Sequence, residues 1–263
     1  MVLSQIIPLM DFLVCQANTY GLLISPDEAQ LMVKHLFMII EKNKQVNLTR
    51  ITNPHDAIVR HYIDSLLFVK AFEDSHCLSA YPSDSLQFLD LGTGAGFPGI
   101  PFSIVTMMNG LLIDSITKKT RAVQEFIVDL ELSSRLSAMP IRAEDLALRS
   151  AASFDLVLVR AVAKLSILIE YASPLLKPNG LLVSSKARIE ADEIMHAEKV
   201  AHLCGMKLVS RETYDLPYSS GHRELFSFMR TANALVDLPR KPGMAVHHQV
   251  RRSEERRVGK ECR

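Results

Sequence analysis

Cysteine is scarce in this chain, and long apolar runs are missing from it. The four cysteines are scattered and form no CxxC pair, which fits a reduced cytosolic protein without a zinc site. No run of about 18 apolar residues occurs, so we expect no transmembrane helix and no membrane partner. The apolar N-terminus lacks a basic leader and is interrupted by Pro8 and Asp11, which argues against a signal peptide. We therefore expect a cytoplasmic globular protein without a bound metal.

An excess of charge of either sign is also missing. The 263 residues hold 30 basic and 29 acidic side chains and are 48% hydrophobic, which excludes wholesale disorder and neither favours nor disfavours a polyanionic partner. The distribution is uneven, because residues 231–263 contain eight basic and four acidic residues. We expect an N-terminal helical extension over residues 1–85, a catalytic domain over 86–230, and a basic tail over 231–263.

The first part of the chain carries helix signals. Ser25-Pro26-Asp27-Glu28 combines a hydroxyl N-cap, a proline in the first turn and acids at the positive end of the helix dipole. A second helix is expected after Asn53-Pro54. The serine-rich residues 75–85 have the composition of a linker.

From residue 86 onward, short apolar runs alternate with helical stretches such as Thr117–Leu132 and Ala187–Leu203. Strands are expected at Leu86–Leu91, Leu111–Ile113, Phe154–Val159, Leu181–Ser184, Lys207–Ser210 and Leu225–Met229. This alternation predicts an α/β fold with a doubly wound, mostly parallel sheet. Ligands of such sheets bind at the carboxyl ends of the strands, where the winding reverses.

A glycine-rich loop follows the first of these strands. It reads Gly92-Thr93-Gly94-Ala95-Gly96-Phe97-Pro98-Gly99, and glycines let a backbone turn sharply and approach a ligand closely. Asp90 precedes the loop, and Asp114 ends the next strand, where a carboxylate can accept hydrogen bonds from ribose hydroxyls. The combination indicates a cofactor that contains adenosine.

Two cofactor classes fit the loop. Gly94, Gly96 and Gly99 match the GxGxxG pattern of dinucleotide sites, so a nicotinamide-dependent oxidoreductase is one alternative. However, the first glycine after the strand is Gly92, and Pro98 and Pro101 fall where the next helix should begin. A diphosphate binds free N–H groups at a helix start, and proline has none. S-adenosylmethionine carries no phosphate, so the loop favours the methyl donor.

Motifs for activating a nucleophile are missing. The sequence has no NPPY-type tetrapeptide, no Pro-Cys pair, and no HExxH, GxSxG or GxxxxGK[ST] motif. A methyltransferase without a dedicated base or thiol suits an acceptor atom with a free lone pair, such as N7 of guanine. The loop is also compatible with a methyltransferase that acts on a small molecule or a protein, and with an adenosine-binding module that has no activity.

The segment from Asp90 to Pro101 resembles the cofactor loop of the ribosomal RNA small subunit methyltransferase G family, also called glucose-inhibited division protein B. Further segments agree in order, and these are Asn47–Arg50, Val59–Leu66, Asp114-Ser115, Val159–Leu165, Pro174–Gly180 and Pro239–Met244. The similarity spans roughly residues 25–244. It implies a Rossmann-like S-adenosylmethionine-dependent methyltransferase with an N-terminal helical extension. It also implies methylation of a guanine N7 in 16S ribosomal RNA, in the bacterial cytoplasm.

The loop and the resemblance together give a set of expected cofactor contacts, which are Gly92, Gly94, Phe97, Asp114, Ser115, Ala143, Glu144 and Arg160. Asp114 is expected to hold the ribose, and Glu144 to lie on the adenine side. No residue is assigned as a catalytic base, because the donor is already activated and positioning suffices. Arg160 and Lys164 are candidate contacts to the substrate or RNA, since a guanidinium does not deprotonate. The implied partner is 16S ribosomal RNA or the small ribosomal subunit.

Several further polar residues allow two interpretations. Arg60-His61 and Asp64-Ser65 form either a hydrogen-bonded clamp between the helical extension and the sheet or a contact to RNA. Lys118, Lys119 and Arg121 form either a solvated helix face or phosphate contacts. Three more basic residues could line the ligand edge, namely Lys186, Arg188 and Arg223. Because the net charge is near zero, binding to RNA requires that basic groups cluster.

The tail departs from the family after Met244. Residues 246–263 show no hydrophobic period, and we expect them to be disordered or foreign to the family. We expect no metal site at His247-His248. Deletion of residues 246–263 is expected to leave activity intact.

Overall fold

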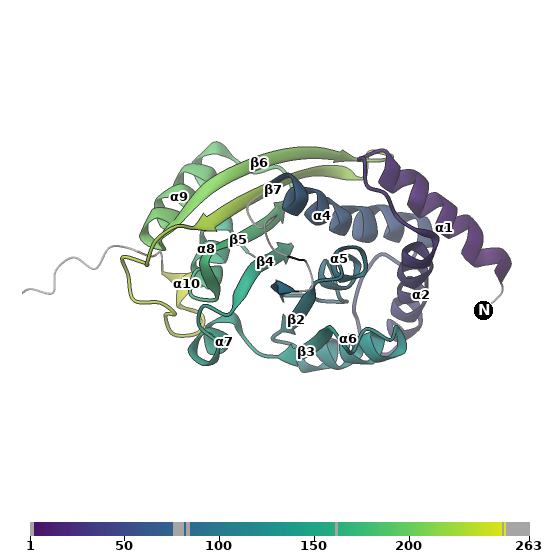
Figure 1. Ribbon diagram of the computed structural model, residues 1–263, viewed down its shortest axis with the longest axis horizontal. Helices are drawn as coiled ribbons and strands as arrows, with labels where there is room; N and C mark the ends of the chain where they lie inside the picture. Colours follow the sequence, from purple (N-terminus) through teal and green to yellow (C-terminus); the bar gives the residue numbers. More distant parts are fainter. Residues whose placement is uncertain (1–2, 76–81, 83–84, 161–162, 249, 251–263) are drawn as a thin grey trace, which may run out of the picture.

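The computed structural model describes residues 3–75, 82, 85–160, 163–248 and 250 (Figure 1). Most of the expected linker at 75–85 lies outside the described residues, and so do residues 251–263 of the tail. Within the described part, no helix is long and apolar enough to cross a membrane.

Seven strands form one sheet in the order β3-β2-β1-β4-β5-β7-β6. Their bounds are β1 Gln87–Leu91, β2 Asn109–Asp114, β3 Leu136–Pro140, β4 Phe154–Arg160, β5 Leu176–Lys186, β6 Met206–Leu216 and β7 Gly221–Arg230. The strands β3, β2, β1, β4 and β5 are parallel, whereas β7 is antiparallel to both β5 and β6. The predicted doubly wound, mostly parallel sheet is confirmed. The strand β3 is not indicated by the sequence, because its side chains are mostly exposed and no apolar run marks it.

The helices before the sheet are α1 Leu3–Asn18, α2 Pro26–Lys42, α3 Pro54–Ala57, the π-helix η1 Ile58–Ile63 and α4 Asp64–Ser75. The later ones are α5 Gly99–Thr106, α6 Thr117–Asp129, α7 Ala143–Arg149, α8 Leu165–Ala172, α9 Ala191–Leu203 and α10 Met244–His247. The predicted start of α2 is confirmed, since Ser25 and Glu28 form a reciprocal capping box. Asn53 caps α3 as the sequence predicts. The helix α1 runs through Pro8.

Alternate residues of the central strands face two different cores. Phe88 and Leu156 pack into a core shared with the N-terminal helices and with α5 and α6, so the helical extension and the sheet bury one continuous apolar surface. Leu89 and Val157 face the other way, into a core formed with α7, α8 and α9. This alternation is the period-two pattern of a strand covered on both faces. Figure 1 shows α1 and α2 on one side of the molecule and α8 and α9 on the other.

The winding reverses between β1 and β4, which pair in parallel at the centre of the sheet. The chain runs outward from β1 through β2 to β3, and then returns to build β4 and β5 on the opposite side. The carboxyl ends of β1 and β4 therefore border the crevice in which ligands of such sheets bind.

The segment after β7 packs back onto the domain. Arg240 pairs with Glu170 at 2.6 Å, the backbone N–H of Gly243 donates to Glu144 at 3.0 Å, and Val250 is buried in the second core. Packing thus extends beyond residue 246, where the dispensable tail was expected to begin. The prediction of dispensability is therefore better placed on residues 251–263.

Candidate functional site

A cavity of about 460 Å³ lies at the carboxyl ends of β1 and β2, beside the start of α7. We call it the glycine-loop cavity. It is lined by Leu91, Gly92, Gly94, Ile113, Asp114, Ser115, Ile116, Lys119, Ile141, Arg142, Ala143, Glu144, Arg160 and Tyr171. Of the predicted cofactor contacts, all but Phe97 line this cavity. The structure therefore gathers at one edge residues that lie up to 68 positions apart in the sequence.

Glycines shape the loop that borders this cavity. Gly92, Gly94 and Gly96 have φ angles of 81°, 60° and 96°, a region that residues with a side chain rarely adopt. The backbone N–H of Gly94 donates to Asp114 Oδ2 at 3.2 Å, while Asp114 Oδ1 accepts from Ile116 N at 2.9 Å. No heavy atom lies within 4 Å of the position that a Cβ on Gly94 would occupy. The loop is thus fixed by Asp114 and leaves open space above Gly94.

The start of α5 offers no free N–H for a diphosphate. Gly99 N donates to Asp90 Oδ2 at 2.8 Å, and Ile100 N donates to Gly96 O at 2.9 Å. Phe102 N donates to Pro98 O at 3.0 Å, and Pro101 has no N–H to offer. The predicted position of Pro98 and Pro101 at the helix start is confirmed. This arrangement fits a nucleoside without phosphates, as in S-adenosylmethionine, and does not fit a dinucleotide.

Asp90 holds the end of the loop by accepting the hydrogen bond from Gly99 N. Its side chain is fully buried, and burial raises its pKa to about 7. Within the described residues its Oδ1 atom has no hydrogen-bond partner, and the same holds for the nearby Thr93 Oγ1. A carboxyl in this state is close to its point of half-protonation at neutral pH.

Phe97 belongs to an aromatic cluster behind the loop instead of lining the cavity. Its ring stacks on His61 with centroids 4.8 Å apart, and it meets Tyr62 and His35 at 5.0 and 5.3 Å. Burial lowers the pKa of His35 and of His61 to about 3, so both rings are neutral. The guanidinium of Arg160 lies over the Phe97 ring, with its Cζ 5.1 Å from the ring centroid.

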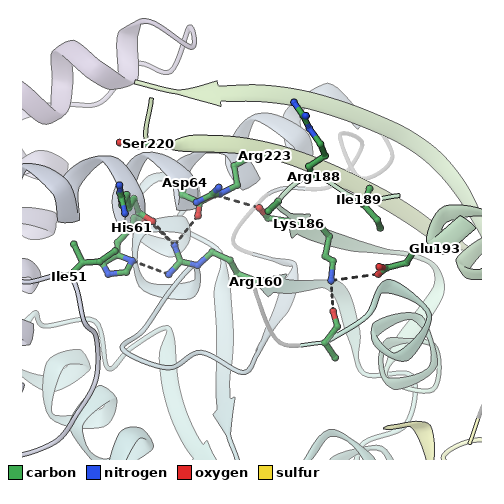
Figure 2. Close-up of a pocket in the computed structure, with 14 residues that line it drawn as sticks. Ile51, His61, Asp64, Arg160, Lys186, Arg188, Ile189, Glu193, Ser220 and Arg223 are labelled. Carbon is green, nitrogen blue, oxygen red and sulfur yellow. Dashed lines mark hydrogen bonds and ion pairs between the residues drawn. The ribbon is translucent and has the colours of Figure 1, made fainter. Parts of the chain in front are cut away.

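A second cavity of about 710 Å³ adjoins the first (Figure 2). We call it the arginine cavity. It is lined by Ile51, Arg60, His61, Asp64, Arg160, Ala163, Ser185, Lys186, Ala187, Arg188, Ile189, Glu193, Ser220 and Arg223. Arg160 lines both cavities and is the residue at which they meet. Basic side chains outnumber carboxylates here, so the required clustering of cations is present although the net charge of the chain is near zero.

Asp64 connects the arginines of this cavity. Its Oδ1 accepts from Arg223 Nε at 3.0 Å and from Ser185 Oγ at 3.5 Å, while its Oδ2 accepts from Arg160 Nη1 at 3.4 Å. Figure 2 shows Asp64 between the two guanidiniums. The Asp64 carboxylate is almost fully buried. Because its three partners belong to β4, β5 and β7, one acidic side chain connects three strands of the sheet to the helical extension. The predicted clamp is confirmed for this residue.

The π-helix η1 supplies further acceptors. Arg160 Nη1 lies 3.3 Å from the carbonyl oxygen of Arg60 and 3.4 Å from that of His61, and Nη2 lies 3.4 Å from His61 Nδ1. Widened helical turns of this kind recur at functional sites, because they re-aim backbone groups. His61 thus belongs to the clamp, whereas the exposed side chain of Arg60 lines the cavity.

The remaining basic residues divide into two groups. Lys186 donates to Ala163 O at 2.6 Å and lies 3.8 Å from Glu193. Among the described residues, the guanidiniums of Arg60 and Arg188 form no hydrogen bond or ion pair. Lys119 lines the glycine-loop cavity, but Lys118, Arg121 and Lys164 are exposed and line neither cavity.

Four lining residues of the glycine-loop cavity are not indicated by the sequence, namely Ile116, Ile141, Arg142 and Tyr171. Arg142 immediately precedes the predicted pair Ala143-Glu144, so its position could have been inferred from them. Tyr171 comes from the end of α8, and no motif marks it. No group of three or more His, Cys, Asp or Glu side chains in the described chain could hold a metal.

Comparison with known proteins agrees with this geometry. The family model for rRNA small subunit methyltransferase G matches residues 28–219. The chain belongs to this family. A ribosomal RNA small subunit methyltransferase G from Carboxydothermus hydrogenoformans is 33% identical over 228 residues, which cover 86% of this chain and 93% of the relative. Family membership rests on sequence similarity, whereas the comparison with solved structures rests on the fold.

Among solved structures, a protein assigned as a sarcosine dimethylglycine methyltransferase of Galdieria sulphuraria gives a TM-score of 0.52 at 10% identity, covering 68% of this chain and 88% of the other. The [4+2]-cyclase SpnF gives 0.50 at 12% identity, covering 65% and 82%. These similarities show the Rossmann-like methyltransferase fold. The cyclase also illustrates that the fold alone does not specify the reaction.

Proposed function

We propose that this member of the methyltransferase G family transfers a methyl group from S-adenosylmethionine to N7 of a guanine in 16S ribosomal RNA. The substrate is the RNA or the small ribosomal subunit that contains it, in the bacterial cytoplasm. The observation that carries the proposal is the junction of the two cavities at Arg160: one suits a nucleoside without phosphates, and the other is basic.

The glycine-loop cavity binds the donor, which supplies an electrophilic methyl group on its sulfonium sulfur. Asp114 accepts hydrogen bonds from the ribose hydroxyls, and the open space over Gly94 admits the ligand close to the backbone. Ile113, Ile116 and Ile141 provide apolar surface for the adenine ring. The exposed Ser115 and the buried Glu144, whose Oε1 accepts from Gly243 N, line the cavity as polar contacts.

The arginine cavity binds the acceptor, and its chemistry favours N7. His61 is a poor base because burial holds its pKa at about 3, and both oxygens of Asp64 already accept from arginines. Glu193 accepts from Leu165 N at 3.1 Å and lies near Lys186. An acceptor that must lose a proton would find no suitable base among these residues. N7 of guanine needs none, because its lone pair is free.

A different cofactor or substrate class fits less well. A nicotinamide cofactor would need N–H groups at the start of α5, where those present are all used internally. A small apolar substrate would gain nothing from the exposed guanidiniums of Arg60 and Arg188, whereas a polyanion such as RNA would be attracted by them.

The direct test is transfer of a radiolabelled methyl group from S-adenosylmethionine into small ribosomal subunits and into protein-free 16S ribosomal RNA. The RNA is then digested to nucleosides, and label is expected in 7-methylguanosine. Label in another nucleoside, or in ribosomal protein, would contradict the assignment of the acceptor. Tight binding of NAD with no binding of S-adenosylmethionine would contradict the assignment of the donor.

A further inference from the structure

An exposed group of aromatic rings lies where α1 meets the turn between β6 and β7. Phe12 and Tyr218 are stacked with centroids 6.1 Å apart and ring planes 22° from parallel. His55 packs edge-on against Phe12 at 4.9 Å. Tyr218 nevertheless remains 72% exposed. Its ring therefore presents a broad apolar surface to the outside, and core packing does not account for its presence there.

The turn that carries Tyr218 is held in an unusual conformation. Tyr218 and Ser219 have φ angles of 55° and 53°, and Ser220 N donates to Pro217 O at 3.1 Å. Two central residues with positive φ are typical of hairpin turns built from Asn-Gly, not from a tyrosine and a serine. Gln16 Nε2 lies 3.4 Å from the Tyr218 hydroxyl, and Tyr20 donates to Asp215 O at 2.6 Å. The helix α1 thus fixes the ring in a strained turn, and such strain tends to persist at functional sites.

Two of the chain segments that carry these rings also supply residues to the wall of the arginine cavity. Ser220, in the turn that carries Tyr218, lines that cavity, and Figure 2 shows it at the rim. Ile51 and Arg60 also line it, and His55 lies between them in the sequence. Because Tyr218 is two residues from Ser220, its ring lies close to the wall of the proposed acceptor site.

We propose that Phe12, His55 and Tyr218 form a platform on which an unpaired base of the substrate RNA stacks, next to the nucleotide whose guanine enters the arginine cavity. This inference rests on the proposed function and names a second contact of the same substrate. Aromatic rings bind any unpaired base through its face, while a base inside a duplex has no free face to offer.

The charges around the platform fit this partner. The guanidiniums of Arg60 and Arg188 lie exposed at the arginine cavity, and no other described residue pairs with them. They are suited to the phosphates that join the stacked nucleotide to the target. The platform thereby adds affinity for single-stranded RNA without adding net charge, which matters in a chain whose net charge is only +1.

A fluorescent reporter tests the stacking directly. The chain contains no tryptophan, so Tyr218→Trp introduces a single indole at the platform. A short single-stranded oligoribonucleotide is expected to quench the indole fluorescence. The same strand in a duplex, at equal phosphate concentration, is expected to leave the fluorescence unchanged. The control is Val128→Trp, which places the indole at an exposed position of α6 that lines neither cavity. Equal quenching by both RNAs, or none by the single strand, would overturn the platform.

Methylation kinetics provide the second test. Tyr218→Ala is expected to raise the KM for ribosomal RNA about tenfold while the Kd for S-adenosylmethionine stays unchanged, and Tyr218→Phe is expected to restore the parental KM. A parental KM in Tyr218→Ala would refute the platform while leaving the proposed function intact. If the parent protein methylates no RNA, the proposed function fails, and the fluorescence titration still decides whether bases stack on this surface.

Discussion

The carboxylate of Asp64 and the guanidinium of Arg160 meet at 3.4 Å although 96 residues separate them. Asp64 begins α4 in the helical extension, and Arg160 ends β4 at the winding reversal of the sheet. The contact joins the part of the chain that covers the sheet to the strand end that borders both cavities.

Replacing Asp64 by asparagine should destabilise the protein strongly. Asp64→Asn leaves Arg160 and Arg223 without their shared carboxylate, and breaking a buried ion pair from one side costs about 3 kcal/mol or more. The matched control is Asp74→Asn, which removes a half-exposed pair with Lys70 and should cost about 0.5 kcal/mol or less. Urea unfolding of both variants measures the difference, and similar losses for the two would contradict the clamp.

Removing the Asp114 carboxylate should weaken binding of the methyl donor. Asp114→Ala loses the proposed ribose acceptor and also the acceptor for Gly94 N, so calorimetry is expected to show an affinity for S-adenosylmethionine lower by about tenfold or more. Asp129→Ala, at the exposed end of α6, serves as the control and should bind as the parent does. Unchanged affinity in Asp114→Ala would refute the ribose assignment.

Two glycines should respond differently to replacement by alanine. A Cβ on Gly110 would lie 2.2 Å from the ring of Phe88, so Gly110→Ala should lower the free energy of unfolding by about 1–3 kcal/mol through overpacking. A Cβ on Gly94 meets no atom within 4 Å but projects from a residue in the loop of the glycine-loop cavity. We expect Gly94→Ala to lose donor affinity with a smaller loss of stability. Thermal unfolding and calorimetry on both variants separate the two effects.

Acid should destabilise the protein through His35. Burial lowers its folded-state pKa to about 3, so below the unfolded value of 6.5 the unfolded chain binds a proton that the folded protein does not. The stability due to this residue is present above that pH and falls as the pH drops toward 3. It differs by about 2 kcal/mol between pH 7 and pH 5.

The variant His35→Gln cannot titrate at this position. The destabilisation that it causes at pH 7 should therefore shrink by about 2 kcal/mol at pH 5, as measured by urea unfolding at both values. His61, whose pKa His35 helps to lower, stays neutral in the folded protein between pH 5 and pH 7, and Asp90 titrates in both proteins. A destabilisation that is equal at the two pH values would show that His35 can take up a proton inside the fold.

The sequence predicted those features whose signals are local. The strand β1, the glycine loop and Asp114 follow one another within a short stretch, so apolar runs and glycine spacing sufficed to locate the glycine-loop cavity. Phe97 shows the limit of this approach. It stands inside the motif, yet its ring stacks on His61 and does not line the cavity. The direction in which a side chain leaves a loop cannot be inferred from the motif alone.

Long-range pairs lay beyond such reasoning. Asp64 and Arg223 are 159 residues apart and meet only because β7 inserts next to β5, a register that no local pattern encodes. Tyr171 likewise lines the glycine-loop cavity from the end of a helix that is distant in sequence from the glycine loop. The strand β3 was missed because exposure, not burial, dominates its side chains.

Arg160 forms part of the wall of two compartments at once. A ligand in either compartment that shifts this guanidinium changes the surface that the other ligand meets. The affinities for donor and acceptor are then thermodynamically linked, and each must change the other by an identical factor. We expect such linkage to appear as an equal change in the affinity for the donor when RNA is bound and in the affinity for RNA when the donor is bound.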